Sequence, residues 1–431
     1  MGPRQLDLAQ APPISVPLRF FLTAPLFAIA AAGVVAFHGG AMFASRFMPA
    51  TLAATHLLAL GCLSMTMAGA LMQIVPVLAG APIARPRMIA GIVHPALTLG
   101  SLLLAAAFLT GAKRLFVAAA VLLCIAFAVL VAAVVHAMLR AGAKDRTARA
   151  LHLAMAALGV TVVLGVGLAL RRVSGAALPI ASLADLHPAW ALFGWVGLLI
   201  AAVAERVVPM FQLTPAYPSW LVRRFGFAVL GGLLVWTVAR QAAVPLIGDI
   251  AAGALAMLYV AFALVTLRLQ RRRRRRRIDV NVLFWRLGMV RAIAAALAFA
   301  TAATGVLPAR AVLVVGVLAI VGAALSLVNG MLYRIVPFIA WFHLYTLAGA
   351  SPGMPNVKDY LTESRQRAQF ALHAAAVVLL VAALVLPDVA ARIAALAFMT
   401  SALAWQANLV AIVRVYRQRA RALASAQPAQ G

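Results

Sequence analysis

The sequence carries little charge for its length, and almost none of that charge is negative. Of its 431 residues, 11% are charged and only 9 are aspartate or glutamate, whereas 65% are hydrophobic. A soluble domain of average composition carries roughly 25% charged residues. The chain therefore lacks the polar surface that a soluble fold requires, and the composition excludes an ordinary soluble enzyme or binding domain.

Two further absences narrow the fold class. The 2 cysteines, Cys62 and Cys124, both fall inside apolar runs, so neither a disulfide framework nor a site built from closely spaced cysteine pairs is expected. The apolar runs also lack the period-two alternation of barrel strands. A run of about 20 apolar residues crosses the ~30 Å hydrocarbon core as a helix, because backbone groups cannot stay unpaired in lipid. We predict an all-α integral membrane protein with about 12 transmembrane helices.

The apolar runs give the positions of these spans, and the basic segments give their orientation. The predicted spans are 17–39, 50–79, 87–110, 114–140, 148–170, 185–212, 222–240, 244–268, 281–306, 309–341, 366–386 and 389–415. Basic residues concentrate after the even-numbered spans, above all in the run Arg271–Arg277. By the positive-inside rule we expect a bacterial-type inner membrane with both tails, 1–16 and 416–431, in the cytoplasm. The N-terminal segment lacks the pattern of a cleaved secretory signal, so we expect the first span to be retained.

The arginine run suggests one kind of partner and argues against another. Seven consecutive arginines beside a membrane favour contact with anionic lipid. The run contains no aromatic residue on which bases could stack, so we expect no nucleic acid partner.

A short motif recurs three times at nearly equal spacing. The segments MQIVPVL, ERVVPMF and YRIVPFI contain Pro76, Pro209 and Pro337, which are 133 and 128 residues apart. Each proline lies near the predicted cytoplasmic end of the second span in its third of the chain, where it kinks the helix. We predict a single transmembrane domain of three pseudo-repeats of four helices, 17–147, 148–279 and 280–415.

Three histidines are placed in the outer half of the predicted bundle. His56 and His187 lie 20 and 22 residues before the prolines of the first two repeats, so they occupy nearly equivalent places, and His38 ends the first span. Imidazole nitrogen suits both haem iron and copper, and bundle metal sites draw ligands from different helices. The alternative is that each is an interfacial histidine bonded to backbone or water.

A second polar set lies in the inner half, near the recurring prolines. It consists of Gln73, Glu205, Arg206 and Arg334, and Arg291 is a further charge deep in the ninth span. Charge buried in a membrane helix usually marks function or a paired partner, so this set is a candidate for holding an anion or relaying protons. The alternative is that the arginines extend to the cytoplasmic headgroups.

Two of these segments resemble motifs of a known family, the NnrS proteins. The first motif runs through His56, Gly61, Gly69, Pro76 and Gly80. The second, ERVVPMF from Glu205 to Phe211, resembles that family's later Arg-x-x-Pro-x-Phe motif. The architecture also resembles the wider heme-copper oxidase subunit I group, which has twelve helices in three four-helix units.

The resemblance implies a membrane protein that binds haem, copper or both, in nitric oxide metabolism, nitrosative stress or respiration, with respiratory or denitrification components as partners. It implies His56 as a ligand, helped by His187 or His38. The histidine pair of the oxidases' tenth helix is absent from Ala311–Ile320, so we expect no complete oxidase or nitric oxide reductase site. Two other hypotheses stay open. One is a transporter of an anionic or metal-chelate solute that uses the inner polar set, and the other is an assembly factor for respiratory complexes.

Overall fold

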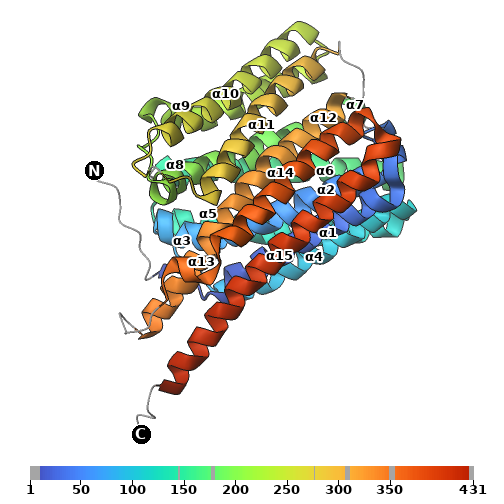
Figure 1. The fold of residues 1–431 in the computed structure, drawn as a ribbon. Helices are drawn as coiled ribbons and strands as arrows, with labels where there is room; N and C mark the ends of the chain where they lie inside the picture. The colour runs from blue at the N-terminus through green and yellow to red at the C-terminus, as the bar shows by residue number, and fades with distance from the viewer. Residues whose placement is uncertain are drawn as a thin grey trace.

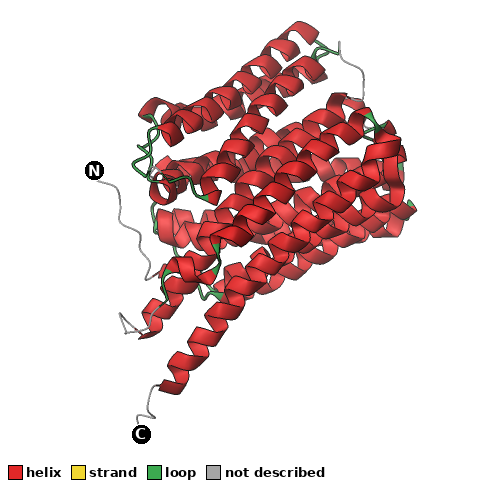
Figure 2. Ribbon diagram, viewed as in Figure 1, coloured by secondary structure: helices red, strands yellow, loops and turns green. Residues whose placement is uncertain are grey.

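The fold is described from a computed structural model for residues 10–143, 146–175, 180–275, 277–305, 311–348 and 355–426. All regular structure in these ranges is helical, as Figure 2 shows. Twelve helices in them are long and apolar enough to cross a membrane. The chain is therefore a multi-pass α-helical membrane protein, which confirms the predicted fold class.

The twelve spans are built from helices and short helical segments in chain order. The first four are α1 (Ser15–His38) with η2 (Gly39–Ala44), then α2 (Pro49–His56) with η3 (Leu57–Ser64) and α3 (Met65–Ala79), then α4 (Pro86–Thr110) and α5 (Lys113–Arg140). The next four are α6 (Arg146–Ser174), then α7 (Ile180–Ala189) with η4 (Trp190–Gly197) and α8 (Leu198–Gln212), then α9 (Ser219–Gln241) and α10 (Pro245–Arg271). The last four are α11 (Val280–Ala303), then α12 (Ala311–Gly316) with η5 (Val317–Leu325) and α13 (Ser326–Ala348), then α14 (Glu363–Val385) and α15 (Pro387–Ala426), with a short 3₁₀ turn, η6 (Val357–Tyr360), before α14.

The main difference from the predicted bounds is at the C-terminus. The last span was predicted to end at residue 415, but α15 continues to Ala426 and projects from the bundle in Figure 1. Residues 416–426 contain arginine, alanine and leucine, which are good helix formers, and no glycine or proline that would end the helix. The predicted tail is thus helical through residue 426. The described residues do not include the rest of this tail (427–431), residues 1–9 of the N-terminal tail, or Arg276 of the arginine run.

The bundle is closed by contact between its first and last spans. Helix α15 packs against both α14 and α1, and Figure 1 shows α9 and α10 together at the opposite edge of the bundle. Outer helices expose apolar stripes. On α5, Val117, Val121 and Ile125 follow one another at intervals of four residues, and all three are exposed. Such a stripe faces lipid, where an apolar surface needs no protein cover.

The second span of each third contains a π-helical stretch in the same place. These three π-segments, η3, η4 and η5, each end 12 residues before the recurring proline of that span. Each also contains a glycine 15 residues before that proline, namely Gly61, Gly194 and Gly322. A π-helix is rare and occurs mostly as a single-turn insertion, frequently at functional sites. The π-segments and their glycines thus recur with the proline motif, once in each predicted four-helix unit.

These three glycines have the same packing role. A Cβ added at Gly61 would overlap the ring of Phe27, at Gly194 it would lie 2.8 Å from the nearest atom, and at Gly322 it would lie 2.9 Å away. The neighbours that would be met are Phe27, Ala157 and Arg291, from α1, α6 and α11. In every unit, therefore, the first helix packs closely against the π-segment at a position where only glycine fits.

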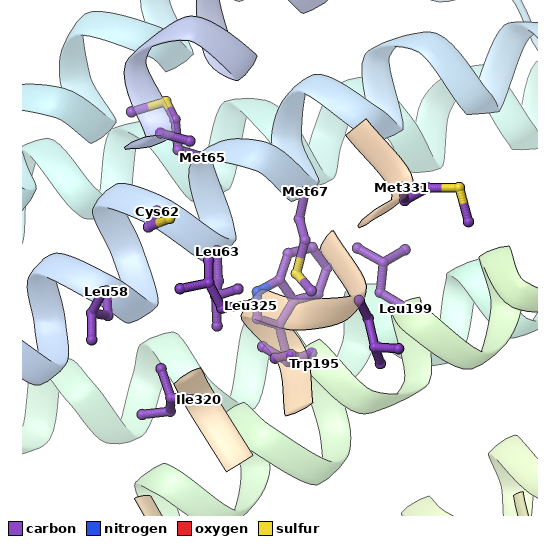
Figure 3. Packing of buried hydrophobic residues seen from close by; sticks show 14 of the residues in the cluster. Leu58, Cys62, Leu63, Met65, Met67, Trp195, Leu199, Ile320, Leu325 and Met331 are labelled. Atoms are coloured by element: carbon purple, nitrogen blue, oxygen red, sulfur yellow. The ribbon is translucent and has the colours of Figure 1, made fainter. Parts of the chain in front are cut away.

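The three units meet in the middle of the bundle at their π-segments. The indole Nε1 of Trp195 in η4 donates to Ser64 Oγ in η3 at 3.3 Å, and η5 contacts both η3 and η4. Figure 3 shows Leu63, Trp195 and Leu325 converging there from the three segments. All three side chains are buried. The centre of the molecule is thus an apolar junction of three equivalent elements.

Candidate metal centre

Two of the predicted ligands, His56 and His187, lie side by side although 131 residues separate them in the chain. His56 is the last residue of α2, directly before η3, and His187 lies in α7, three residues before η4. Their ring centroids are 6.2 Å apart, and the ring planes differ by 15°. The fold thus brings two residues from equivalent spans into neighbouring positions.

The hydrogen bonds of the two rings determine which nitrogen is available. His56 Nδ1 lies 2.8 Å from the Leu52 carbonyl oxygen, and His187 Nδ1 lies 3.1 Å from the Thr161 carbonyl oxygen on α6. A carbonyl can only accept, so Nδ1 carries the proton in both rings and Nε2 keeps its lone pair. Metal-ligating histidines are held in this way, by a bond from the other ring nitrogen.

Two other histidines in the bundle, His94 and His373, carry their proton on Nε2 instead of Nδ1. The Thr23 hydroxyl donates to a backbone carbonyl, so His94 Nε2 must donate to Thr23 Oγ1, at 2.9 Å. The same logic applies to His373, whose Nε2 donates to Ser326 Oγ at 2.8 Å. Both rings use Nε2 for a hydrogen bond to another helix, and we interpret them as structural. The backbone bond alone does not mark a ligand, since His152 also bonds to a carbonyl through Nδ1, but His152 does not line the cavity.

The histidine pair borders a cavity of about 590 Å³ between the three units. Residues of all three π-segments line it, together with apolar side chains of most surrounding helices. Phe108 packs on the His56 ring at 5.0 Å between centroids. Gly165 of α6 makes room for the other ring, because a Cβ there would lie 3.0 Å from His187 Cε1. Both rings are half-buried and border this apolar space.

Charged residues gather at one end of the cavity. Asp185 accepts from Arg46 at 2.6 Å and from Arg240 at 2.7 Å, and Arg172 also lines the cavity. This end joins the loop after α1, the start of α7 and the end of α9. Asp185 is therefore engaged by two arginines. Three guanidinium groups and one carboxylate leave this mouth positively charged.

The third predicted ligand, His38, is not part of this arrangement. It ends α1, is exposed, and packs against Phe37 at 5.1 Å between ring centroids. The equivalent position in the third unit, counted back from Pro337, is Val317, at the start of η5. Among the described residues, no cluster of three or more histidine, cysteine, aspartate or glutamate side chains with metal-binding geometry is present. The candidate centre thus offers two protein ligands.

The inner polar set is divided between different helices. Arg334 forms an ion pair with Asp279, the N-cap residue of α11, and Arg206 Nε donates to Thr147 Oγ1 on α6 at 3.2 Å. Gln73 is half-buried on α3, and Glu205 adjoins Arg206 on α8. None of these four residues lines the central cavity. The arginines thus bind partners on neighbouring helices.

Arg291 lies near the buried His373 rather than in the inner set. Its Nη2 donates to the Ala374 carbonyl at 3.4 Å, and its side chain packs on Gly322 of η5. Its Nη1 is buried and has no hydrogen-bond partner among the described residues. Because its side chain packs on a π-segment glycine, Arg291 helps to position η5.

One buried polar chain was missed by the sequence analysis. Gln270 donates to Gln212 at 2.9 Å, Gln212 donates to Asn281 at 2.8 Å, and Asn281 donates to the Gly330 carbonyl at 2.7 Å. These amides link α10, α8, α11 and α13 across the second and third units. Amide side chains within or beside apolar runs were the available signal.

In comparisons with known proteins, no family model and no curated protein matched this chain.

Proposed function

We propose that this protein binds haem through His56 and His187, as an NnrS-like membrane protein of nitric oxide, nitrosative-stress or respiratory metabolism. The observation that carries the proposal is the pair of imidazoles, from two equivalent spans, with both Nε2 lone pairs available at one cavity. A single histidine on an apolar helix would not support it.

The spacing of the pair would allow both rings to hold one group. Their centroids are 6.2 Å apart, and the ring planes differ by 15°. Metal–imidazole bonds are about 2.0–2.1 Å long, so two rings at this separation are within reach of a single metal ion.

The number of ligands favours haem over an isolated copper ion. A haem would need few ligands from the protein, which His56 and His187 could supply, whereas protein copper sites usually recruit further side chains. The cavity volume of about 590 Å³ lies in the range of small-molecule and cofactor sites. Its apolar walls suit a macrocycle, and the arginines at its mouth suit carboxylates.

The third unit has Val317 at the position where the other two units have a histidine. This favours binding, sensing or electron transfer over turnover of a substrate at a two-metal site. A haem held by two histidines would supply one-electron redox chemistry. His56 and His187 would hold and orient that group, their Nδ1 bonds to Leu52 and Thr161 would keep the rings in place, and the apolar walls would exclude water.

The test is an optical spectrum with metal analysis of the full chain purified in mild detergent. We expect reduced haem bands with near-stoichiometric iron, lost in His56→Ala and strongly reduced in His187→Ala. His152→Ala is the matched control, because His152 makes the same backbone bond without lining the cavity. A colourless protein that contains neither iron nor copper, and takes up no haem when it is supplied, would sink the proposal.

A second candidate, a transporter of an anionic or metal-chelate solute, draws support from the cavity and the positively charged mouth. Proline-kinked spans in repeated units are typical of transporters. In that case uptake into proteoliposomes would depend on the mouth arginines Arg46, Arg172 and Arg240, as well as on Arg206 and Arg334, and would survive His56→Ala. The ion pair of Arg334 with Asp279 argues against a free anion site there.

We further propose an inner-membrane location with both termini in the cytoplasm and the arginine run on anionic lipid. An even number of candidate spans would bring both ends of the chain to one side, and the positive-inside rule favours the cytoplasm. Within the run, Arg277 is paired with Glu363 at 2.6 Å, and the exposed side chains of Arg271, Arg272 and Arg274 suit contact with the lipid surface. Reporter fusions at the C-terminus that are active only outside the cytoplasm would test the orientation, and activity of such a fusion would contradict it.

A further inference from the structure

A small basic notch lies between α6 and α9, apart from the central cavity. Its lining residues are Arg146, Arg149, Ala150 and Leu153 from α6, and Val222, Arg223, Gly226 and Phe227 from α9. The α6 residues recur at helical spacing and form one face. A Cβ at Gly226 would lie 2.7 Å from Leu153 Cδ1, so the two helices approach closely there. The arginines flank the groove nearer the beginnings of both helices.

The notch carries three positive charges, and no described acidic residue forms an ion pair with them. Arg146, Arg149 and Arg223 are all exposed. Arg223 bonds only to the backbone and hydroxyl oxygens of Ser219, at 3.2 Å each, and none of the three arginines forms an ion pair with a described residue. Both helices begin at this end, and their dipoles add positive potential. The notch therefore has the charge of an anion site.

The depth of the notch in the membrane follows from its apolar neighbours. Phe227 is 57% exposed on α9, and Leu153 is half-buried beside it. Trp220, near the start of α9, is 53% exposed, and exposed tryptophan at a span end is typical of the headgroup region. The three arginines are thus at headgroup level, and an apolar wall leads from them toward the hydrocarbon core.

We propose that the notch binds one anionic phospholipid, with its phosphate between Arg146, Arg149 and Arg223 and an acyl chain along Leu153 and Phe227. Guanidinium groups form strong bonds with phosphate oxygens, and basic pockets between membrane helices bind anionic headgroups. The exposed apolar wall next to the charges favours a lipid over free phosphate. This site is independent of the haem proposal and of the arginine run.

Native mass spectrometry of the full chain in mild detergent, titrated with phosphatidylglycerol, tests the site. The double variant Arg149→Gln, Arg223→Gln removes two of its three cations. Each arginine near an anionic lipid is worth about a fivefold change in affinity, so binding weakens about 25-fold. The control variant Arg417→Gln, Arg421→Gln removes two exposed arginines from the end of α15 and leaves the bound fraction nearly unchanged.

Further measurements identify which molecule binds in the notch. Phosphatidylcholine is expected to bind weakly, and Phe227→Ser is expected to weaken phosphatidylglycerol binding severalfold without a change in charge. Equal binding of phosphatidylglycerol by wild type and the Arg149/Arg223 double variant, or an equal loss in the control, overturns the proposal. Displacement of the lipid by millimolar inorganic phosphate, together with unchanged binding in Phe227→Ser, would identify a free-phosphate site instead and also overturn it.

Discussion

The close packing at Gly61 leads to a sharp prediction about stability. In Gly61→Ala the new Cβ would overlap the ring of Phe27, which is buried on α1 and cannot move without displacing its neighbours. Overpacking of this kind typically costs about 1–3 kcal/mol. At Gly159, on α6, a Cβ would meet no atom within 4 Å, so Gly159→Ala gains up to about 0.5–1 kcal/mol of helix preference. We expect the two variants to differ by about 1.5–4 kcal/mol in the free energy of unfolding.

Reversible unfolding in mixed micelles with increasing dodecyl sulfate, followed by tryptophan fluorescence, measures this difference. Trp195 is a suitable reporter because it bridges η4 to Ser64 of η3. If the clash with Phe27 is the cause, adding Phe27→Leu to Gly61→Ala restores part of the loss, with a coupling free energy of about 1 kcal/mol or more. Equal stability of Gly61→Ala and Gly159→Ala, or additive effects of the two substitutions, would refute the packing argument.

Two further predictions concern polar links between units. Asp185→Asn leaves the two arginines of the cavity mouth without their shared carboxylate and is expected to cost about 1 kcal/mol, since all three side chains are partly exposed. The loss should shrink in a thermal unfolding assay as salt rises from 0.1 to 1 M, and a salt-independent loss would count against the ion-pair explanation. Asn281→Leu breaks the middle of the buried amide chain and leaves a Gln212 donor unpaired, at a cost of about 1–2 kcal/mol. Gln270→Leu, at the end of that chain, should cost less in the same assay, and the reverse order would contradict this chain of bonds.

The number of spans could be predicted because it needs little information. An apolar run of sufficient length predicts a span regardless of which helices the span packs against. The helix ends needed more, because the extension of α15 to Ala426 depends on the absence of a stop signal rather than on apolar character. The π-segments were in principle visible, since Gly61, Gly194 and Gly322 precede their prolines by the same 15 residues. An alignment of the three segments on their prolines does not detect these glycines if it compares only the polar residues near each proline.

The candidate site could be predicted only in part. The equal distances of His56 and His187 from their prolines indicated equivalent places, but equivalence alone does not give a separation or a proton position. Those depend on partners from other helices, such as the Thr161 carbonyl that holds His187. The pairing of Arg334 with Asp279, 55 residues away, has no sequence signal either. Contacts between distant helices are therefore where sequence reasoning ends.

The geometry also weighs the two functional hypotheses against each other. His187 and Arg206 are 19 residues apart on one span, so at 1.5 Å per residue they lie about 28 Å apart, nearly the thickness of the hydrocarbon core. On that span the cavity is lined from Ala184 to Ile200 and does not reach Arg206. A ligand in the cavity therefore contacts the histidines directly, whereas contact with the inner arginines requires the spans to move. Because the arginines already hold partners on neighbouring helices, such a movement would have to break those bonds. Both histidines of the haem proposal, in contrast, already line the cavity.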